Sequence, residues 1–175
     1  MLDRLTRRRR PARPDLSTVA VFCAPFVVGI VGSRLTLPNL RGWYRSLDRP
    51  PWTPPDRVFG PVWTTLYLLM GIAGVRVWRA KDRRTGAVDD PVMVALAIHA
   101  IQLQLNLAWS WLFFDRRRID LALADMVALD AAVAATMVAF RRVRPDAAVL
   151  LLPYLAWSSF ATALNADILR RNGRR

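Results

Sequence analysis

Residues that form disulfides or hold metal ions are scarce in this sequence. It has one cysteine, Cys23, and one histidine, His99, in 175 residues. A disulfide framework is therefore excluded, and a His/Cys metal site lacks the paired ligand spacing that it needs. The sequence also has no hydrolytic triad motif, phosphate-binding loop or nucleotide fingerprint. These absences disfavour metal-dependent, hydrolytic and nucleotide-dependent enzymes.

Lysine is scarce as well, although the chain is strongly basic, with 26 lysine and arginine residues and a net charge of +13. The arginines do not gather on one face, as they do in nucleic-acid-binding domains. They form short clusters between apolar runs, at 7–10, 83–84, 116–118, 141–144 and 170–175. This pattern is typical of the loops that flank transmembrane helices. We therefore expect no nucleic-acid partner.

Hydrophobic residues make up 54% of the chain and gather in five runs. About 20 helical residues cross a hydrocarbon core of about 30 Å. We predict an all-α membrane protein, a five-helix transmembrane bundle with spans at 17–37, 58–78, 91–114, 119–140 and 147–169. The bundle domain covers 17–172, between a basic disordered tail (1–16) and a short C-terminal tail (173–175). Short connections after the second span predict antiparallel neighbours, and the basic tail favours a cytoplasmic N-terminus.

The long connection between the first two spans is rich in tryptophan and proline. Trp43–Trp63 reads WYRSLDRPPWTPPDRVFGPVW. Proline fixes φ, removes an amide donor and restricts the preceding residue. The pairs Pro50-Pro51 and Pro54-Pro55 should therefore stiffen this segment and keep it from forming a helix. We predict that it forms a rigid lid over one end of the bundle.

The third span carries polar side chains that are costly in lipid unless they face the bundle interior or a cavity. Gln102, Asn106 and Ser110 recur every four residues and share one face, with Trp109 at its edge. Interhelical hydrogen bonding is the expectation for Gln102, whereas Asn106 suits either such a bond or a pocket wall. His99 lies off this face, and we expect it at the membrane interface; haem ligation is a weaker alternative.

The fourth span contains two carboxylates, Asp125 and Asp130, at depths where a lone charge is unfavourable. A structural partner, such as Arg76 or a residue of another subunit, is the preferred interpretation, and a proton relay is the alternative. Small residues recur every four positions and suit close helix packing, within the bundle or across a dimer: Ala124, Ala128 and Ala132.

In the fifth span, Pro153 predicts a kink. Trp157, Ala161 and Asn165 follow at four-residue spacing and share one face. An aromatic wall beside a small residue suits a flat, apolar ligand. The remaining tryptophans fit the aromatic belt of a membrane protein: Trp43, Trp52, Trp78 and Trp111.

Four segments in this order, WYRSLDRPPWTPP, FGPVWTTLYLLMGIAG, QLQLNLAWSWLFF and PYLAWSSFATALN, resemble the signatures of the TspO/MBR family. These are the tryptophan-rich sensory proteins related to the mitochondrial translocator protein (peripheral benzodiazepine receptor). The similarity covers about Trp43 to Asn172. The resemblance implies a five-helix bundle, commonly dimeric, whose apolar pocket near one end is closed by the first loop. It also implies a multi-pass protein of a bacterial cell membrane that binds protoporphyrin IX or haem and requires no cofactor.

The resemblance assigns ligand-binding positions by motif: Tyr44, Pro54, Trp63, Asn106, Trp109, Trp157 and Ala161. Some bacterial members are reported to promote light-dependent breakdown of protoporphyrin, and their two pocket tryptophans match Trp63 and Trp157. The animal sterol motif has a tyrosine where this chain has Ala166 and Asp167, so the resemblance does not extend to sterol binding.

Three classes of function follow from the resemblance. Tetrapyrrole binding for sensing or regulation is preferred; a porphyrin transporter or efflux component and a light-dependent porphyrin-degrading enzyme are the alternatives. The indoles at Trp63 and Trp157 suit a flat π system. Loop arginines suit either its propionates or phospholipid headgroups: Arg41, Arg45, Arg49 and Arg57.

Overall fold

The structure, a computed structural model, describes residues 15–81 and 90–173. Most of the predicted tails therefore lies outside the described residues. The elements are α1 (Leu16–Asn39), the π-helical turn η1 (Leu40–Tyr44), α2 (Asp56–Trp78), α3 (Asp90–Ser110), the π-helical turn η2 (Trp111–Asp115), α4 (Ile119–Val143), α5 (Pro145–Val149) and α6 (Leu152–Asn172).

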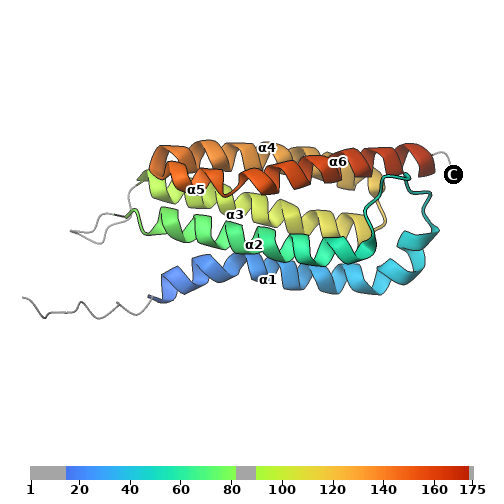
Figure 1. Cartoon of the computed structure of the whole chain (residues 1–175), viewed down its shortest axis with the longest axis horizontal. Helices are drawn as coiled ribbons and strands as arrows, with labels where there is room; N and C mark the ends of the chain where they lie inside the picture. The colour runs from blue at the N-terminus through green and yellow to red at the C-terminus, as the bar shows by residue number, and fades with distance from the viewer. Residues whose placement is uncertain (1–14, 82–89, 174–175) are drawn as a thin grey trace, which may run out of the picture.

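Five helical segments are long and apolar enough to cross a membrane: Leu16–Tyr44, Asp56–Trp78, Asp90–Asp115, Ile119–Val143 and Pro145–Asn172. They lie side by side in one elongated bundle (Figure 1). The most extensive contacts join α1 to α2, α3 to α4, and α4 to α6. The predicted all-α membrane bundle is confirmed, and consecutive spans are antiparallel neighbours.

The first span begins at a capped end. The Oδ1 atom of Asp15 accepts the N–H of Thr18 at 2.6 Å, as an N-cap carboxylate does. This hydrogen bond holds the pKa of Asp15 down to about 2. The other oxygen lies 3.3 Å from Nζ of Lys81, which follows the end of α2. The start of α1 is therefore tied to the end of its neighbour.

The connection between α1 and α2 is shorter than the Trp/Pro-rich stretch suggests. The helix continues through η1, so that Trp43 and Tyr44 are helical, and the non-helical part is Leu47–Pro55. Its prolines keep this part out of a helix, as expected, and it contains a turn at Pro51 and Trp52. Asn172, the last residue of α6, fastens it: its Oδ1 accepts the N–H of Asp48 at 3.0 Å and its Nδ2 donates to the carbonyl of Asp48 at 2.9 Å.

The fifth span is broken where Pro153 predicts a disturbance. The short helix α5 ends at Val149, a turn occupies Leu150 and Leu151, and α6 starts with Pro153 in its first turn. A proline there lacks only an amide donor that a first turn leaves unbonded anyway. The interruption lets the second half of the span run along α4 as a separate helix (Figure 1).

The expectation for His99 is wrong. This residue lies in the middle of α3 and is buried, with its ring 5.3 Å from that of Phe140. Its Nδ1 atom lies 3.1 Å from Nε2 of Gln102. The histidine and the glutamine are three residues apart and thus neighbours on one helix face, so the ring pairs with the amide nitrogen of Gln102 inside the bundle instead of reaching the membrane interface.

Arg76 is not the partner of the carboxylates in α4. Its guanidinium pairs with Asp146 at 2.8 Å, at the end of the bundle away from the α1–α2 loop. Asp130 instead accepts the hydroxyl of Thr162 in α6 at 2.8 Å. Asp125 has an oxygen, Oδ2, that is buried and without a hydrogen-bond partner among the described residues. The interhelical bond from Thr162 thus stabilises one of the two carboxylates.

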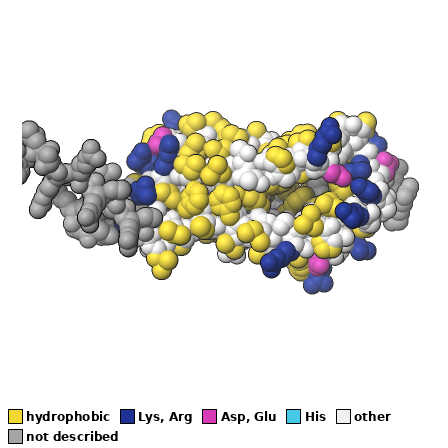
Figure 2. Space-filling view, turned by 60° about the horizontal axis from the view of Figure 1, so that its bottom comes forward, with side chains coloured by type: hydrophobic (Ala, Val, Ile, Leu, Met, Phe, Trp, Pro, Cys, Tyr) yellow, Lys and Arg dark blue, Asp and Glu magenta, His cyan; other side chains and the backbone are white. Residues whose placement is uncertain are grey.

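The surface has the character of a membrane protein. Figure 2 shows apolar side chains over the middle of one face and basic side chains towards its two ends. On α4, Ala124 and Ala128 are exposed. The close approach that their spacing favours is therefore not made within the bundle.

Candidate functional site: a cavity between α1, α2, α3 and α6

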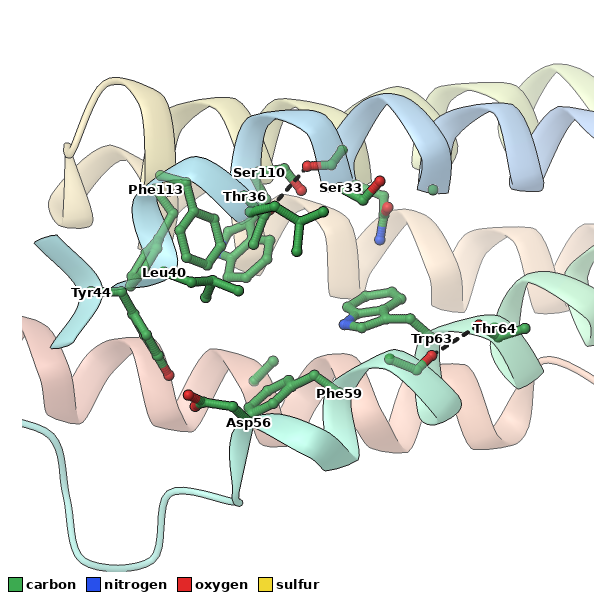
Figure 3. A pocket seen from close by; sticks show the side chains of 18 of the residues that line it. Ser33, Thr36, Leu40, Tyr44, Asp56, Phe59, Trp63, Thr64, Ser110 and Phe113 are labelled. Carbon is green, nitrogen blue, oxygen red and sulfur yellow. Dashed lines mark hydrogen bonds between the residues drawn. The ribbon is translucent and has the colours of Figure 1, made fainter. Parts of the chain in front are cut away.

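A cavity of about 520 Å³ lies in the half of the bundle nearer the α1–α2 loop. Four of the five spans contribute to its wall, and α4 does not. Figure 3 shows the indole of Trp63 pointing into this space from α2, across from Leu40 and Phe113. The wall is mainly apolar, as is usual for sites that bind small organic molecules.

A hydrogen-bonded network holds the deeper wall of the cavity in place. The hydroxyl of Tyr67 donates to Oδ1 of Asn106 at 3.0 Å, and Nδ2 of Asn106 donates to the hydroxyl of Tyr154 at 3.2 Å. The network joins α2, α3 and α6. The ring of Trp63 stacks on Tyr67 with centroids 5.5 Å apart. The indole is therefore oriented by a neighbour that is itself fixed.

An aromatic and aliphatic cluster closes the end of the cavity next to the loop. Its buried members come from η1, η2 and α6: Tyr44, Phe113, Phe114, Leu164 and Ile168. The rings pack edge to face or tilted, with centroids 5.0–6.2 Å apart, as aromatic pairs prefer. The Pro-rich residues Leu47–Pro55 do not line the cavity. The direct cover is thus this cluster, and the predicted lid lies outside it.

Two fully buried polar atoms on the cavity-lining residues have no hydrogen-bond partner within the described chain. They are Nε1 of Trp109, a donor, and Oδ1 of Asn165, an acceptor. Asn165 is buried, and its Nδ2 donates to the carbonyl of Ile119 at 3.2 Å, which fixes the amide. A buried polar atom left unpaired is costly. Both atoms are shielded by neighbouring protein atoms, so this cost is internal to the protein.

One charged residue among the described ones lines the cavity, Asp56 at the start of α2. Its carboxylate lies 3.5 Å from Nη1 of Arg49 in the loop. The guanidinium of Arg49 also sits over the ring of Tyr44, 4.8 Å from its centroid. Figure 3 shows the Tyr44 hydroxyl and the Asp56 carboxylate at the same end of the cavity. The polar end of the site is therefore the end next to the loop.

The structure brings five of the seven motif-assigned positions to the wall: Tyr44, Trp63, Asn106, Trp109 and Ala161. Trp157 does not line the cavity. Its ring packs edge to face against Phe59, a lining residue, with centroids 5.8 Å apart. Pro54 belongs to the inner edge of the loop, on a separate and more open depression.

Sequence reasoning missed the contribution of α1. The residues of α1 that line the cavity include Gly29 and Gly32. A Cβ atom on Gly29 would lie 2.7 Å from Cδ2 of Tyr67. The absence of a side chain at Gly29 thus lets the Tyr67 ring lie against the helix. The sequence feature that could have indicated this part of the wall is the group of small residues in the apolar run of the first span: Gly29, Gly32 and Ser33.

The residues of this site do not form a metal centre. In the parts of the chain that the structure describes, no three His, Cys, Asp or Glu side chains come together as a metal site requires. His99 lies outside the cavity wall. The cavity therefore offers aromatic faces and one ion pair to a ligand.

Comparison with known proteins gives a consistent result. The sequence profile described as the TspO/MBR family matches residues 21–171. The translocator protein of Homo sapiens is 40% identical over 161 residues, which cover 92% of this chain and 93% of the human one. The tryptophan-rich protein TspO of Chlorobaculum tepidum is 43% identical over 145 residues (83% and 89%). The tryptophan-rich sensory protein of Cereibacter sphaeroides is 41% identical over 133 residues (76% and 78%). This chain belongs to the TspO/MBR family.

Proposed function

We propose that this protein binds a tetrapyrrole, protoporphyrin IX or haem, in the cavity beside Trp63, and that it acts in sensing or regulating tetrapyrrole levels. The observation that carries the proposal is the cavity itself, about 520 Å³ with an oriented indole on its wall. That volume falls within the range of about 300–1,000 Å³ that holds organic ligands. The Cereibacter sphaeroides relative is named a tryptophan-rich sensory protein, and that name supports the second part.

The charges at the loop end support one orientation of the ligand. A macrocycle against Trp63 would direct its propionates towards Arg49, which contacts the lining residues Asp56 and Tyr44. Carboxylates and guanidinium groups form strong, directional pairs. Asp56 would compete with the propionates for Arg49, because the two already lie 3.5 Å apart. Binding would then exchange one ion pair for another.

Absorbance titration of protoporphyrin IX into the detergent-solubilised protein tests the proposal. Aromatic contacts contribute about 0.5–1.5 kcal/mol beyond buried area, so Trp63→Phe should weaken binding about tenfold. Trp111→Phe is the matched control, because Trp111 is 40% exposed on η2 and does not line the cavity. It should change affinity by less than about twofold. Equal affinities in the wild type and both variants would reject this site.

Light-dependent breakdown of the porphyrin is a second candidate, favoured by the position of Trp63 in the wall. One electron would pass from the indole to the photoexcited porphyrin and leave an indole radical cation and a porphyrin radical anion. Products formed under illumination by the wild type and absent in Trp63→Phe at saturating ligand would support it. Identical product yields from both proteins would remove this candidate and leave binding intact.

We also propose that the protein forms a homodimer. The outer face of α4 supports this, because its exposed alanines permit the close backbone contact that small residues give between transmembrane helices. Ala124 and Ala128 lie on that face. Crosslinking in native membranes checks the proposal, with Ala124→Cys expected to give a dimer band in a Cys23→Ser background. A monomer alone at every crosslinker concentration would contradict an interface at this face.

A further inference from the structure

The lining residues of the cavity differ sharply in exposure from one side to the other. On the loop side the apolar ones are buried; Leu164 is 6% exposed and Ile168 is 2% exposed. On the side between α1 and α2 they are open; Ile30 is 56% exposed and Leu37 is 63% exposed. Gly60 and Thr64 of α2, which face the same opening, are exposed as well. The cavity is thus closed at its end and open at its side.

This opening lies at the depth of the hydrocarbon chains. Leu37 and Ile30 are 7 and 14 residues before Tyr44, where the first span ends. At 1.5 Å per residue they lie about 10 Å and about 21 Å from that end. Figure 2 shows a hollow in the half of the molecule nearer the loop, bordered by apolar side chains. A molecule leaving the cavity here would enter lipid.

The hydroxyl groups at the opening are already hydrogen-bonded within the protein. They donate to carbonyls of their own helices: Ser33 to Ile30 at 2.8 Å, and Thr64 to Gly60 at 2.9 Å. Such local bonds satisfy a hydroxyl where water is excluded. A mouth built in this way is compatible with acyl chains and with the apolar body of a ligand.

From this geometry we infer that the cavity is loaded and emptied sideways, from the bilayer, through the opening between α1 and α2. The inference rests on the proposed function and deepens it, because the ligand must then be an amphiphile dissolved in the membrane. Its apolar ring passes between the helices while its charged groups stay near the membrane surface, at the end marked by Asp56 and Arg49. The Pro-rich loop need not open.

A side chain can be placed in the mouth without disturbing the fold. A Cβ atom at Gly60 meets no heavy atom within 4 Å, and the same holds at Gly42, which is exposed on η1 and does not line the cavity. Gly60→Phe narrows the mouth, and Gly42→Phe is its matched control. Gly60→Leu is measured beside them as a smaller obstruction of the mouth, and Kd is determined for each variant so that rates are compared at known affinity.

The experiment is stopped-flow uptake and release of protoporphyrin IX by the protein in phosphatidylcholine nanodiscs. A narrowed mouth raises the barrier in both directions, so uptake and release should both slow about tenfold while Kd changes less than about threefold. Gly42→Phe should keep the rates of the wild type. Asn172→Ala, which removes the two hydrogen bonds between α6 and Asp48 of the loop, should not accelerate uptake.

The outcomes distinguish a failure of the proposed entry path from a failure of the proposed binding site. Wild-type rates in a Gly60 variant that retains affinity would overturn lateral loading, and faster uptake in Asn172→Ala would assign the route to the loop instead. Either result, with binding by the wild type intact, leaves the proposed function standing. No binding by the wild type removes the proposed function and the route together.

Discussion

The indole ring of Trp63 lies nearly parallel to the phenol ring of Tyr67, with centroids 5.5 Å apart and planes inclined by 27°. Tyr67 is held on its other side by the hydrogen bond to Asn106. The indole in the cavity is therefore oriented before a ligand arrives. A preorganised wall lowers the cost of ordering side chains on binding.

Loss of the Tyr67 hydroxyl tests this preorganisation. Tyr67→Phe keeps the stacked ring but leaves Oδ1 of Asn106 without its donor. Hydrogen bonds between membrane helices contribute about 0.6–2 kcal/mol. We expect a lower midpoint of thermal unfolding and a protoporphyrin affinity reduced about threefold, which corresponds to about 0.7 kcal/mol. Unchanged values in both measurements would show that the ring alone is sufficient.

Packing at Gly29 provides a second test. A methyl group there would press on the ring of Tyr67, and overpacking of this kind costs about 1–3 kcal/mol. Gly29→Ala should therefore lower the thermal midpoint and weaken porphyrin binding, as measured by scanning fluorimetry and absorbance titration. Gly42→Ala is the control, because a Cβ at Gly42 meets nothing within 4 Å and Gly42 does not line the cavity. Equal losses in the two variants would point to a general effect of removing glycine.

The two tryptophans that match the family's pocket pair should behave differently. Trp63 lines the cavity, whereas Trp157 packs behind Phe59. Trp157→Phe should change porphyrin affinity by less than about threefold, compared with about tenfold for Trp63→Phe. Titrations of both variants under one condition check this. A larger loss in Trp157→Phe would mean that Phe59 moves aside and exposes the second indole to the ligand.

The fastening of the Pro-rich loop makes a separate prediction. Asn172→Ala removes both hydrogen bonds to Asp48. Hydrogen exchange at Leu47–Thr53 should speed up because local opening becomes easier, while porphyrin affinity stays within about twofold because the buried cluster around Tyr44 covers the cavity. Unchanged exchange would show that other contacts, such as Trp52 on Phe160, hold the loop.

The fold could be read largely from the sequence, because hydropathy and length report directly on crossing a bilayer. The five spans and the interruption at Pro153 depend on local properties of the chain. The boundary between the first span and the loop was harder to predict. The helix runs past Pro38 and through the π-helical turn η1 to Tyr44, whereas the prolines that keep the loop out of a helix begin only at Pro50.

The misplaced residues share one cause, which is contact between distant segments. Trp157, Ala161 and Asn165 do share a helix face, but Phe59 of α2 covers only the first of them. His99 is buried because Phe140 of α4 lies against its ring. Arg76 finds Asp146 across the bundle end instead of a carboxylate in α4. Periodicity within one helix carries no information on these partners.

An experimental structure of the protein with protoporphyrin IX tests the central claim most directly. We predict density for the macrocycle inside the cavity, in contact with Trp63 and Ala161. Its propionates should point towards Arg49, and it should not contact Trp157. Density for the porphyrin on the outer surface of the bundle, with side chains filling the space beside Trp63, would contradict it.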